Sequence, residues 1–366
     1  MRGCVRLASR AMRFAMTTAT APIDALAAAL AERPDMAGVR AEDIVPLADT
    51  GLAHWHARIG TTGRLARMPK QSQMRLGAAE NLAYQAESFR AAEPSGHTPK
   101  LFDVVAPTAG LPLGALIVEA IDGRPPHLPD DLTAIAEALA ALHRCPTDGA
   151  AAGLKRSANP LTAMLLEVRD QAEYLEPAEL DPVAELDIRS ELDKVFRQVE
   201  RLSRPPRALI SFDAHPGNFL IEAGGRAVLV DLDKMRLSSP GFDLAHATLY
   251  TSTTWDPNTS AELTEADTAA FYAAWEAAMG EAAAAHRPFL EITRRLMWLW
   301  SVTWCAKWQV LSGDAAKDAE AVEANAEDWS EAKSEPKLIA HVAARVADYL
   351  APATIAKVRR TLVLKG

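Results

Sequence analysis

Residues 209–232 constrain the fold most, because they place three polar side chains around two short apolar runs. The segment reads LISFDAHPGNFLIEAGGRAVLVDL. Asp213 and Asn218 are five positions apart, and the Pro-Gly pair between them interrupts regular structure and predicts a tight loop. The two apolar runs that follow are separated by A-G-G-R, which predicts a hairpin. Asp231 is therefore predicted at a strand end, where it can approach Asn218.

A carboxylate, an amide and a second carboxylate in this order are typical of phosphoryl-transfer sites. Transfer from ATP needs one carboxylate that orients the attacking hydroxyl and accepts its proton, and a carboxylate and an amide that hold metal ions against the triphosphate. Each fragment alone is common, so the indication rests on their linked order and spacing. The alternative is that Asp213 and Asn218 are turn residues that hydrogen-bond their own backbone.

This segment resembles the aminoglycoside phosphotransferase and choline kinase family, small-molecule kinases with a protein-kinase-like fold. The family's catalytic loop, close to H-G-D-x-H-x-x-N, and its later I-D-[FW]-[ED] correspond here to S-F-D-A-H-P-G-N and V-D-L-D. The resemblance implies Asp213 as the catalytic base, and Asn218 and Asp231 as Mg²⁺ ligands. It also implies that His215 supports the catalytic loop or contacts the phosphate, and that Asp243, in P-G-F-D-L-A, holds the loop in place.

The chain departs from the family pattern at two places in this region. Ser211 and Phe212 replace the His-Gly that precedes the catalytic aspartate, and Lys234 brings a cation close to the predicted metal site. These departures leave a nucleotide-binding pseudokinase with little or no turnover as the alternative function. An adaptor without nucleotide binding is a further alternative, against which the complete Asp-Asn-Asp set argues. A protein kinase is disfavoured because no A-P-E motif follows Asp231.

The resemblance implies an α+β, bilobal protein-kinase-like fold with a small β-rich N-lobe and a larger, mainly helical C-lobe. Residues 23–121 are expected to form the nucleotide-binding N-lobe with a leading helix. Residues 122–366 are expected to form the C-lobe, with the catalytic loop, the metal site and a helical substrate region. Residues 1–22 are expected to be a disordered extension, whose arginines without acidic residues resemble a transit peptide. The internal methionines favour the different interpretation that the first residue of the sequence lies upstream of the true start of translation.

The pattern of the N-lobe predicts short strands at residues 45–47, 54–59 and 64–68. Gly51 lies in the turn before the second of these strands, where the resemblance implies a flap over the nucleotide phosphates.

The resembled fold also presents a basic residue from its third strand to the phosphates and holds it by an ion pair with a carboxylate on the next helix. Alternation along the strand favours Arg67 as the basic residue, with Lys70 as the alternative. Glu87 is favoured as the carboxylate, because its distance in sequence from the loop before the next strand is close to the family's spacing. Glu80 is the alternative.

Residues 113–121 form an apolar run that resembles the family's connection between the lobes. Backbone groups from Glu119 to Ile121 are expected to hydrogen-bond adenine, which requires no particular side chain. Residues 132–143 have the spacing of a buried amphipathic helix, and His143 at its end is expected to be a packed residue rather than a catalytic one.

Trp300, Trp304 and Trp308 recur at a spacing of four and therefore form one stripe on a helix. Such a stripe can wall a pocket for a protonated or quaternary amine through cation–π contacts. The alternative is that the stripe packs in the core, as most aromatic stripes do.

Composition limits the remaining functions. The net charge of −9 argues against a nucleic-acid partner and is compatible with a cationic substrate. The three cysteines have no C-x-x-C spacing, so neither a disulfide framework nor a zinc site is indicated, and a cytoplasmic location fits. The longest apolar stretch, residues 296–311, is too short to span a membrane. The expected reaction uses ATP and Mg²⁺ on a small-molecule hydroxyl, with the acceptor and the oligomeric state left open.

Overall fold

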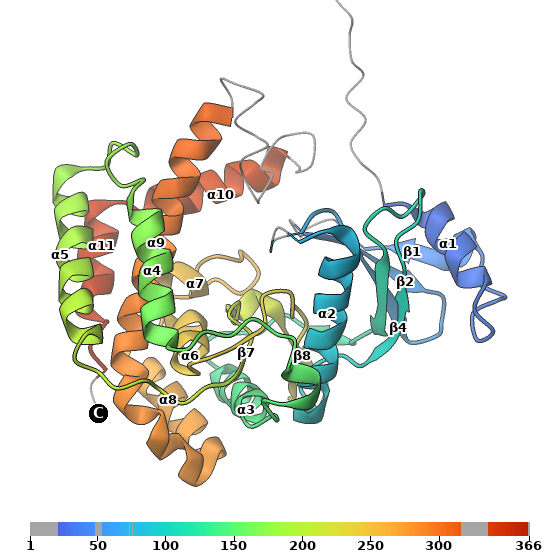
Figure 1. The fold of residues 1–366 in the computed structure, drawn as a ribbon, viewed down its shortest axis with the longest axis horizontal. Helices are drawn as coiled ribbons and strands as arrows, with labels where there is room; N and C mark the ends of the chain where they lie inside the picture. The colour runs from blue at the N-terminus through green and yellow to red at the C-terminus, as the bar shows by residue number, and fades with distance from the viewer. Residues whose placement is uncertain (1–20, 48–52, 73, 75, 316–335, 365–366) are drawn as a thin grey trace, which may run out of the picture.

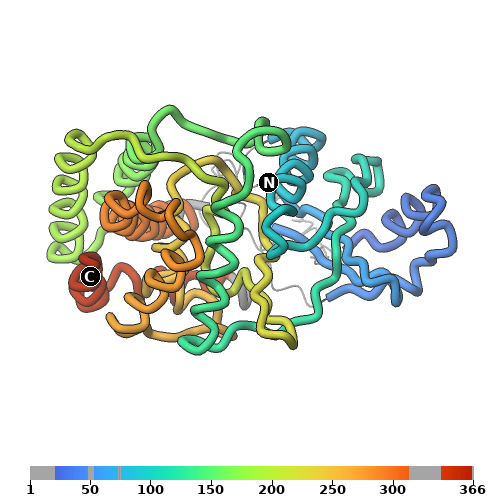
Figure 2. Tube along the Cα trace, turned by 90° about the horizontal axis from the view of Figure 1, so that it is seen from below, coloured from blue at the N-terminus to red at the C-terminus, as the bar shows by residue number. Residues whose placement is uncertain are grey.

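The computed structural model describes residues 21–47, 53–72, 74, 76–315 and 336–364. The chain folds into two lobes that lie along the long axis of the molecule (Figure 1). A small lobe with a β-sheet and α1 lies at one end, and a larger helical lobe lies at the other. The perpendicular view shows the same two lobes at opposite ends of the molecule (Figure 2). The α+β class predicted from the sequence is therefore what the structure has.

The N-lobe is built on a five-stranded antiparallel sheet with the strand order β1-β2-β3-β5-β4. Alternate side chains of its inner strand β5 enter two different hydrophobic clusters, Ile117 with α1 on one face and Leu116 and Val118 with α2 on the other. The elements are α1 (Ile23–Ala31), β1 (Ile44–Pro46), β2 (His54–Ile59), β3 (Arg64–Pro69), α2 (Ala78–Ala92), β4 (Leu101–Val105) and β5 (Ala115–Glu119).

The C-lobe is mainly helical. Its helices are α3 (Leu132–His143), α4 (Pro160–Ala172), α5 (Pro182–Val199), α6 (Gly241–Thr248), α7 (Tyr250–Thr253), α8 (Glu265–Met279), α9 (Leu290–Ala315), α10 (Pro336–Tyr349) and α11 (Pro352–Arg360). Its strands are β6 (Gly123–Arg124), β7 (Ala208–Ile210), β8 (Phe219–Glu222), β9 (Ala227–Leu229) and β10 (Arg236–Ser238). The short 3₁₀ helices are η1 (Ala41–Asp43) and η2 (Glu93–Ser95) in the N-lobe, and η3 (Gly149–Ala151), η4 (Pro216–Asn218), η5 (Gly280–Ala285) and η6 (Arg287–Phe289) in the C-lobe.

Sequence signals account for several helix starts. Asn159 accepts a hydrogen bond from the first turn of α4, Asp181 does the same for α5, and a proline follows each cap. Thr264 and Asp267 form a reciprocal capping box at the start of α8. The long helix α9 packs against α4, α5, α6 and α10 and forms the spine of the larger lobe.

Two small antiparallel sheets position the loops of the predicted site. β8 and β9 form the predicted hairpin, β8 also pairs with β6, and β10 pairs with β7. The loop after β7 and the segment after β9 are joined directly, because Val230 N–H donates to the Asn218 carbonyl at 2.9 Å. The predicted proximity of Asn218 and Asp231 follows from this bond.

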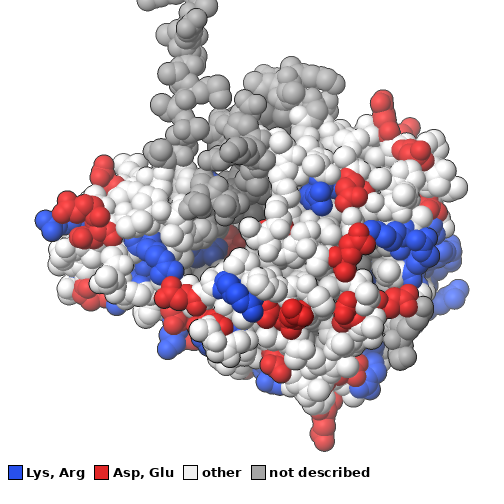
Figure 3. All heavy atoms as spheres, turned by 180° about the vertical axis from the view of Figure 1, so that it is seen from behind, with Lys and Arg blue, Asp and Glu red and all other residues white. Residues whose placement is uncertain are grey.

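The predicted lobe boundary at residues 121 and 122 falls between β5 and β6 and stays a prediction. Among the described residues, no helix combines the length and apolar character that crossing a membrane requires. Acidic and basic side chains are interspersed over the face shown in Figure 3.

Candidate functional site

The loop that follows β7 begins with an unusual backbone conformation. Phe212 has a φ of +62°, in the left-handed region, where a residue with a side chain costs about 1–3 kcal/mol. A glycine, which the resembled family has at this position, adopts the conformation without that cost. The Phe212 ring is buried and packs edge-on against Trp300, with centroids 5.5 Å apart. The guanidinium of Arg236 lies 3.5 Å from its centroid on another side. The side chain thus ties the loop to α9 and β10.

Asp243, on α6, holds the backbone of this loop. Its carboxylate accepts the N–H groups of Ser211 and Phe212, each at 2.8 Å, and lies 3.1 Å from His143 Nε2. Trp275 Nε1–H donates to His143 Nδ1 at 3.0 Å, so the imidazole carries its proton on Nε2 and donates it to Asp243. All of these side chains are buried. This is the supporting position predicted for Asp243, and it explains why His143 is a packed residue.

We expect Asp243→Asn to lower the free energy of unfolding by about 3 kcal/mol, because an amide cannot accept from all three donors and turns its own N–H₂ toward one of them. Urea unfolding followed by circular dichroism measures the change. The exposed Asp130→Asn is the matched control and should change stability by less than about 0.5 kcal/mol. Equal stability of the two variants would show that Asp243 does not hold the loop.

Asp213, the predicted base, lies next to an ammonium group and an imidazole. Lys234 Nζ lies 3.1 Å from its Oδ2, and His246 Nδ1 lies 3.9 Å from its Oδ1. Burial alone would raise the pKa of Asp213. The lowering effect of Lys234 and of the imidazoles of His215 and His246 is larger, so the pKa lies below its usual range. Asn218 Nδ2–H donates to the Asp213 carbonyl at 2.7 Å. The side chain is therefore an ionised carboxylate in a fixed loop.

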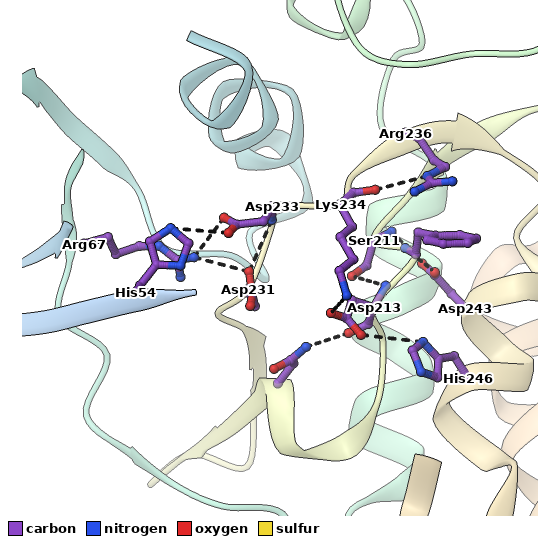
Figure 4. A network of polar contacts seen from close by, with 12 residues as sticks. His54, Arg67, Ser211, Asp213, Asp231, Asp233, Lys234, Arg236, Asp243 and His246 are labelled. Atoms are coloured by element: carbon purple, nitrogen blue, oxygen red, sulfur yellow. Dashed lines mark hydrogen bonds and ion pairs between the residues drawn. The ribbon is translucent and has the colours of Figure 1, made fainter. Parts of the chain in front are cut away.

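Arg67 joins β3 of the N-lobe to the segment that carries Asp231 (Figure 4). Its guanidinium donates to the Val230 carbonyl at 2.6 Å, to Asp231 Oδ1 at 3.2 Å and to Asp233 Oδ1 at 3.0 Å. His54 approaches Asp233 from the same side, with Nε2 3.3 Å from Oδ2. Burial and the neighbouring Asp231 raise the pKa of Asp233, against the lowering effect of Arg67.

The expected partner of Arg67 is wrong. The guanidinium pairs with Asp231 and Asp233 of the other lobe, whereas the half-buried Glu87 lies against Gly153. The other candidate, Glu80, is exposed on α2. Burial explains why Arg67 does not pair with Glu87. A buried cation needs close anionic or polar partners, and two carboxylates and a carbonyl of the segment after β9 supply them.

A single cavity of about 830 Å³ brings the predicted residues together. Its lining includes the site residues Arg67, Glu119, Ile121, Asp213, His215, Asn218 and Asp231. Glu87 is not among them. Gly51 lies outside the described residues, so its predicted place over the phosphates stays a prediction.

The connection between the lobes forms one wall of this cavity through Glu119, Ala120 and Ile121. Glu119 N–H donates to the Lys100 carbonyl, and Ala120 N–H donates to the Gly63 carbonyl, both at 2.9 Å. These two groups are already bonded, which makes the backbone of Ile121 the better candidate for an adenine contact.

Another part of the cavity lining is aromatic and acidic. Trp300 and Trp304 line it, whereas Trp308 is largely buried, so the tryptophan stripe serves the pocket in part and the core in part. Trp255 faces Trp304 edge-on, with centroids 6.0 Å apart. Asp256 also belongs to this part of the lining, close enough to Gly217 that a Cβ there would lie 2.6 Å from its Oδ2.

Sequence reasoning missed two residues of the site, Asp233 and His246. Asp233 anchors Arg67, and His246 approaches Asp213. Lys234 was expected near the metal site, and the structure places its ammonium against Asp213. Burial lowers the pKa of His246 to about 4, and Nδ1 of both His246 and His215 has no hydrogen-bond partner within the described part of the chain. A signal for His246 was present, since it lies three positions after Asp243 on the same helix.

The donor set near the loops fits a Mg²⁺ ion. Asn218 Nδ2 is committed to the Asp213 carbonyl, so its amide oxygen is the atom that remains as a ligand, and Asp231 adds a carboxylate in the same cavity. Magnesium sites in nucleotide-using proteins need only one or two protein ligands beside phosphates and water. Over the described ranges, no cluster of three or more His, Cys, Asp or Glu side chains offers a separate metal site.

Comparison with known proteins gives a consistent result. The profile of the phosphotransferase enzyme family matches residues 57–289. A choline/ethanolamine kinase family protein from Mesorhizobium loti is 19% identical, with a TM-score of 0.55 over 89% of this chain and 100% of that chain. The choline kinase from Cryptosporidium parvum is 12% identical, with a TM-score of 0.57 over 93% of this chain and 97% of that chain.

A third similar structure contains ligands. It is a thermostable mutant of the aminoglycoside phosphotransferase APH(4)-Ia, solved as a ternary complex with AMP-PNP and hygromycin B. It is 14% identical, with a TM-score of 0.52 over 88% of this chain and 98% of that chain. No curated protein matches the chain. The bilobal, protein-kinase-like fold and the family resemblance predicted from the sequence are confirmed.

Proposed function

The chain belongs to the phosphotransferase enzyme family, and from that premise we propose that it transfers the γ-phosphoryl group of ATP to a hydroxyl group of a small molecule. One observation carries the proposal. Asp213, Asn218 and Asp231 line the same cavity as the connection between the lobes, so that a nucleotide held at Ile121 and an acceptor held at Asp213 would share one space.

Asp213 would orient the acceptor hydroxyl and accept its proton as the new oxygen–phosphorus bond forms. The low pKa supports this role, because the carboxylate is ionised before the acceptor arrives. The hydrogen bonds of Asp243 to Ser211 and Phe212 hold the preceding backbone, so little reorganisation is needed.

Asn218 and Asp231 would hold Mg²⁺, which when bound neutralises negative charge on the phosphates. Arg67 would steady the nucleotide phosphates, for which it would exchange part of its contact with Asp231. Glu87 has no place in this proposal, since Asp233 fills the anchoring role instead.

The acceptor would be a neutral or cationic compound with an apolar portion. Trp255, Trp300 and Trp304 present aromatic surface at the acceptor end, and Asp256 adds a carboxylate. Aromatic faces next to a carboxylate attract ammonium groups, each face contributing about 1–2 kcal/mol when water is excluded. Trp300 is held in orientation by its Nε1–H bond to Glu167 at 2.8 Å.

A pseudokinase is the second candidate, and a specific observation favours it. Lys234 and Arg67 contact Asp213 and Asp231, the carboxylates proposed as base and metal ligand. If these ion pairs persist when the nucleotide binds, the protein would bind ATP without turning it over.

We expect ATP to bind the wild-type protein in a Mg²⁺-dependent manner, and ADP to be released when the correct acceptor is added. Calorimetry with and without Mg²⁺ measures the first, and a coupled ADP assay over amino-alcohols, sugars and aminoglycosides measures the second. Mg²⁺-insensitive binding without ADP release from any acceptor would favour the pseudokinase. No ATP binding at all would exclude both functions.

A further inference from the structure

Lys234 extends from the segment after β9 straight to the predicted base (Figure 4). Its Nζ lies 3.1 Å from Asp213 Oδ2, and the side chain lines the cavity at 20% exposure. The ammonium therefore sits where the acceptor hydroxyl and the transferring phosphorus would meet.

The backbone that carries Lys234 is fixed at the residue itself and at the residue that follows it. Arg236 Nε–H donates to the Lys234 carbonyl at 3.2 Å, and Tyr84 O–H, on α2, donates to the Met235 carbonyl at 2.6 Å. Arg236 in turn lies over the ring of Phe212, directly before Asp213. The backbone positions of Lys234 and Asp213 are thus coupled, while the long side chain of Lys234 can still change its partner.

The other cations that line the described part of the cavity are placed elsewhere. Arg67 is bound to two carboxylates and a carbonyl between the lobes. Arg58 is paired with Asp122 at 2.7 Å and is 40% exposed near the connection between the lobes. Lys234 is the described lining cation that reaches Asp213.

Geometry brings this ammonium next to the phosphoryl group. A hydroxyl that donates to Asp213 lies about 2.6–3.2 Å from the carboxylate. In an attacking arrangement that hydroxyl lies about 3–3.5 Å from phosphorus. An ammonium that contacts the same carboxylate can therefore reach a phosphoryl oxygen by rotating its side chain.

We propose that Lys234 is a catalytic residue that moves its ammonium from Asp213 to the oxygens of the phosphoryl group during transfer. The proposal rests on the function proposed above. The acceptor oxygen–phosphorus bond forms as the bond from phosphorus to the bridging oxygen of ADP breaks, and the hydroxyl proton goes to Asp213. Lys234 stays protonated and supplies positive charge, while its departure from Asp213 makes the carboxylate a better proton acceptor.

The same position has a second consequence. An ammonium beside Asp213 repels a divalent cation placed at Asn218 and Asp231, so it weakens metal binding until the phosphates add their negative charge. Lys234 would thus couple metal binding to nucleotide binding.

The test compares Lys234→Met and Lys234→Arg with wild type, and Lys357→Met is the matched control. Lys357 is also ion-paired, with Glu262 at 2.9 Å, but its ammonium lies outside the cavity lining. We expect Lys234→Met to lower kcat about 10²–10³-fold with the acceptor KM little changed, because a cation on the transferring group acts mainly in the transition state. Lys234→Arg should recover part of the rate, and Lys357→Met should retain it.

Binding of Mn²⁺ to nucleotide-free protein gives a readout that does not depend on turnover. Lys234→Met should bind Mn²⁺ more tightly than wild type, by about tenfold if roughly 1.4 kcal/mol of repulsion is removed. A Lys234→Met enzyme as active as wild type, or more active, would overturn the catalytic role and make Lys234 an inhibitory contact. Unchanged Mn²⁺ affinity would overturn the coupling. A wild type that releases no ADP with any acceptor would instead overturn the proposed function.

Discussion

Replacement of Asp213 by asparagine should lower kcat by about 10³-fold or more, since an amide keeps the shape of the carboxylate but cannot accept the proton of the hydroxyl. The variant should still bind ATP with Mg²⁺, because Asp213 is not proposed as a metal ligand. Stability should fall by about 1.5–3 kcal/mol, because the ion pair that is lost, with Lys234, is largely buried. Single-turnover ADP formation measures the chemical step.

The exposed Asp170→Asn, on α4, is the matched control for this charge change and should leave kcat unaltered. If Asp213→Asn keeps kcat within tenfold of wild type, Asp213 is not the base. A variant that also fails to bind ATP would indicate that the loop has collapsed, which near-ultraviolet circular dichroism would reveal.

Replacement of Asp231 by alanine should abolish the Mg²⁺-dependent part of ATP binding and lower kcat by at least about 10³-fold. The variant removes the carboxylate that would hold the metal but leaves Arg67 bonded to Asp233 and to the Val230 carbonyl. Calorimetry of ATP binding with and without Mg²⁺ measures the loss.

Asp233→Asn separates the two carboxylates. It weakens the anchor of Arg67 and should lower stability, but it leaves Asp231 in place, so Mg²⁺ dependence should persist. If Asp231→Ala keeps the Mg²⁺ dependence and Asp233→Asn loses it, the metal ligand is Asp233 and the proposed assignment is wrong.

Local patterns in the sequence predicted much of the fold. The helix at residues 132–143 and the strand at 54–59 have the predicted bounds, because apolar spacing and turn residues specify them over short distances. The approach of Asn218 to Asp231 was also predictable, since a hairpin of known length connects them.

Contacts between the lobes could not be predicted in this way. Arg67 and Asp233 are separated by 166 positions, and no local spacing shows that they meet, whereas Glu87 lies on the next helix and looked favourable by spacing alone. The direction of Lys234 was likewise undetermined, because a long side chain on a loop has several rotamers and only the packed loop selects one. The positive φ of Phe212 was missed because glycine is the usual signal for that conformation.

Arg67 also bears on how the cleft opens. Its guanidinium belongs to β3, and its three partners belong to the segment after β9, so any hinge motion that parts the lobes must stretch or break these bonds. An anionic ligand that replaces Asp231 as the partner of Arg67 would fill the site and, at the same time, remove one of the bonds that join the two lobes. We therefore expect ligand exchange and the opening of the cleft to depend on the same few side chains, because Arg67, Asp231 and Asp233 take part in both.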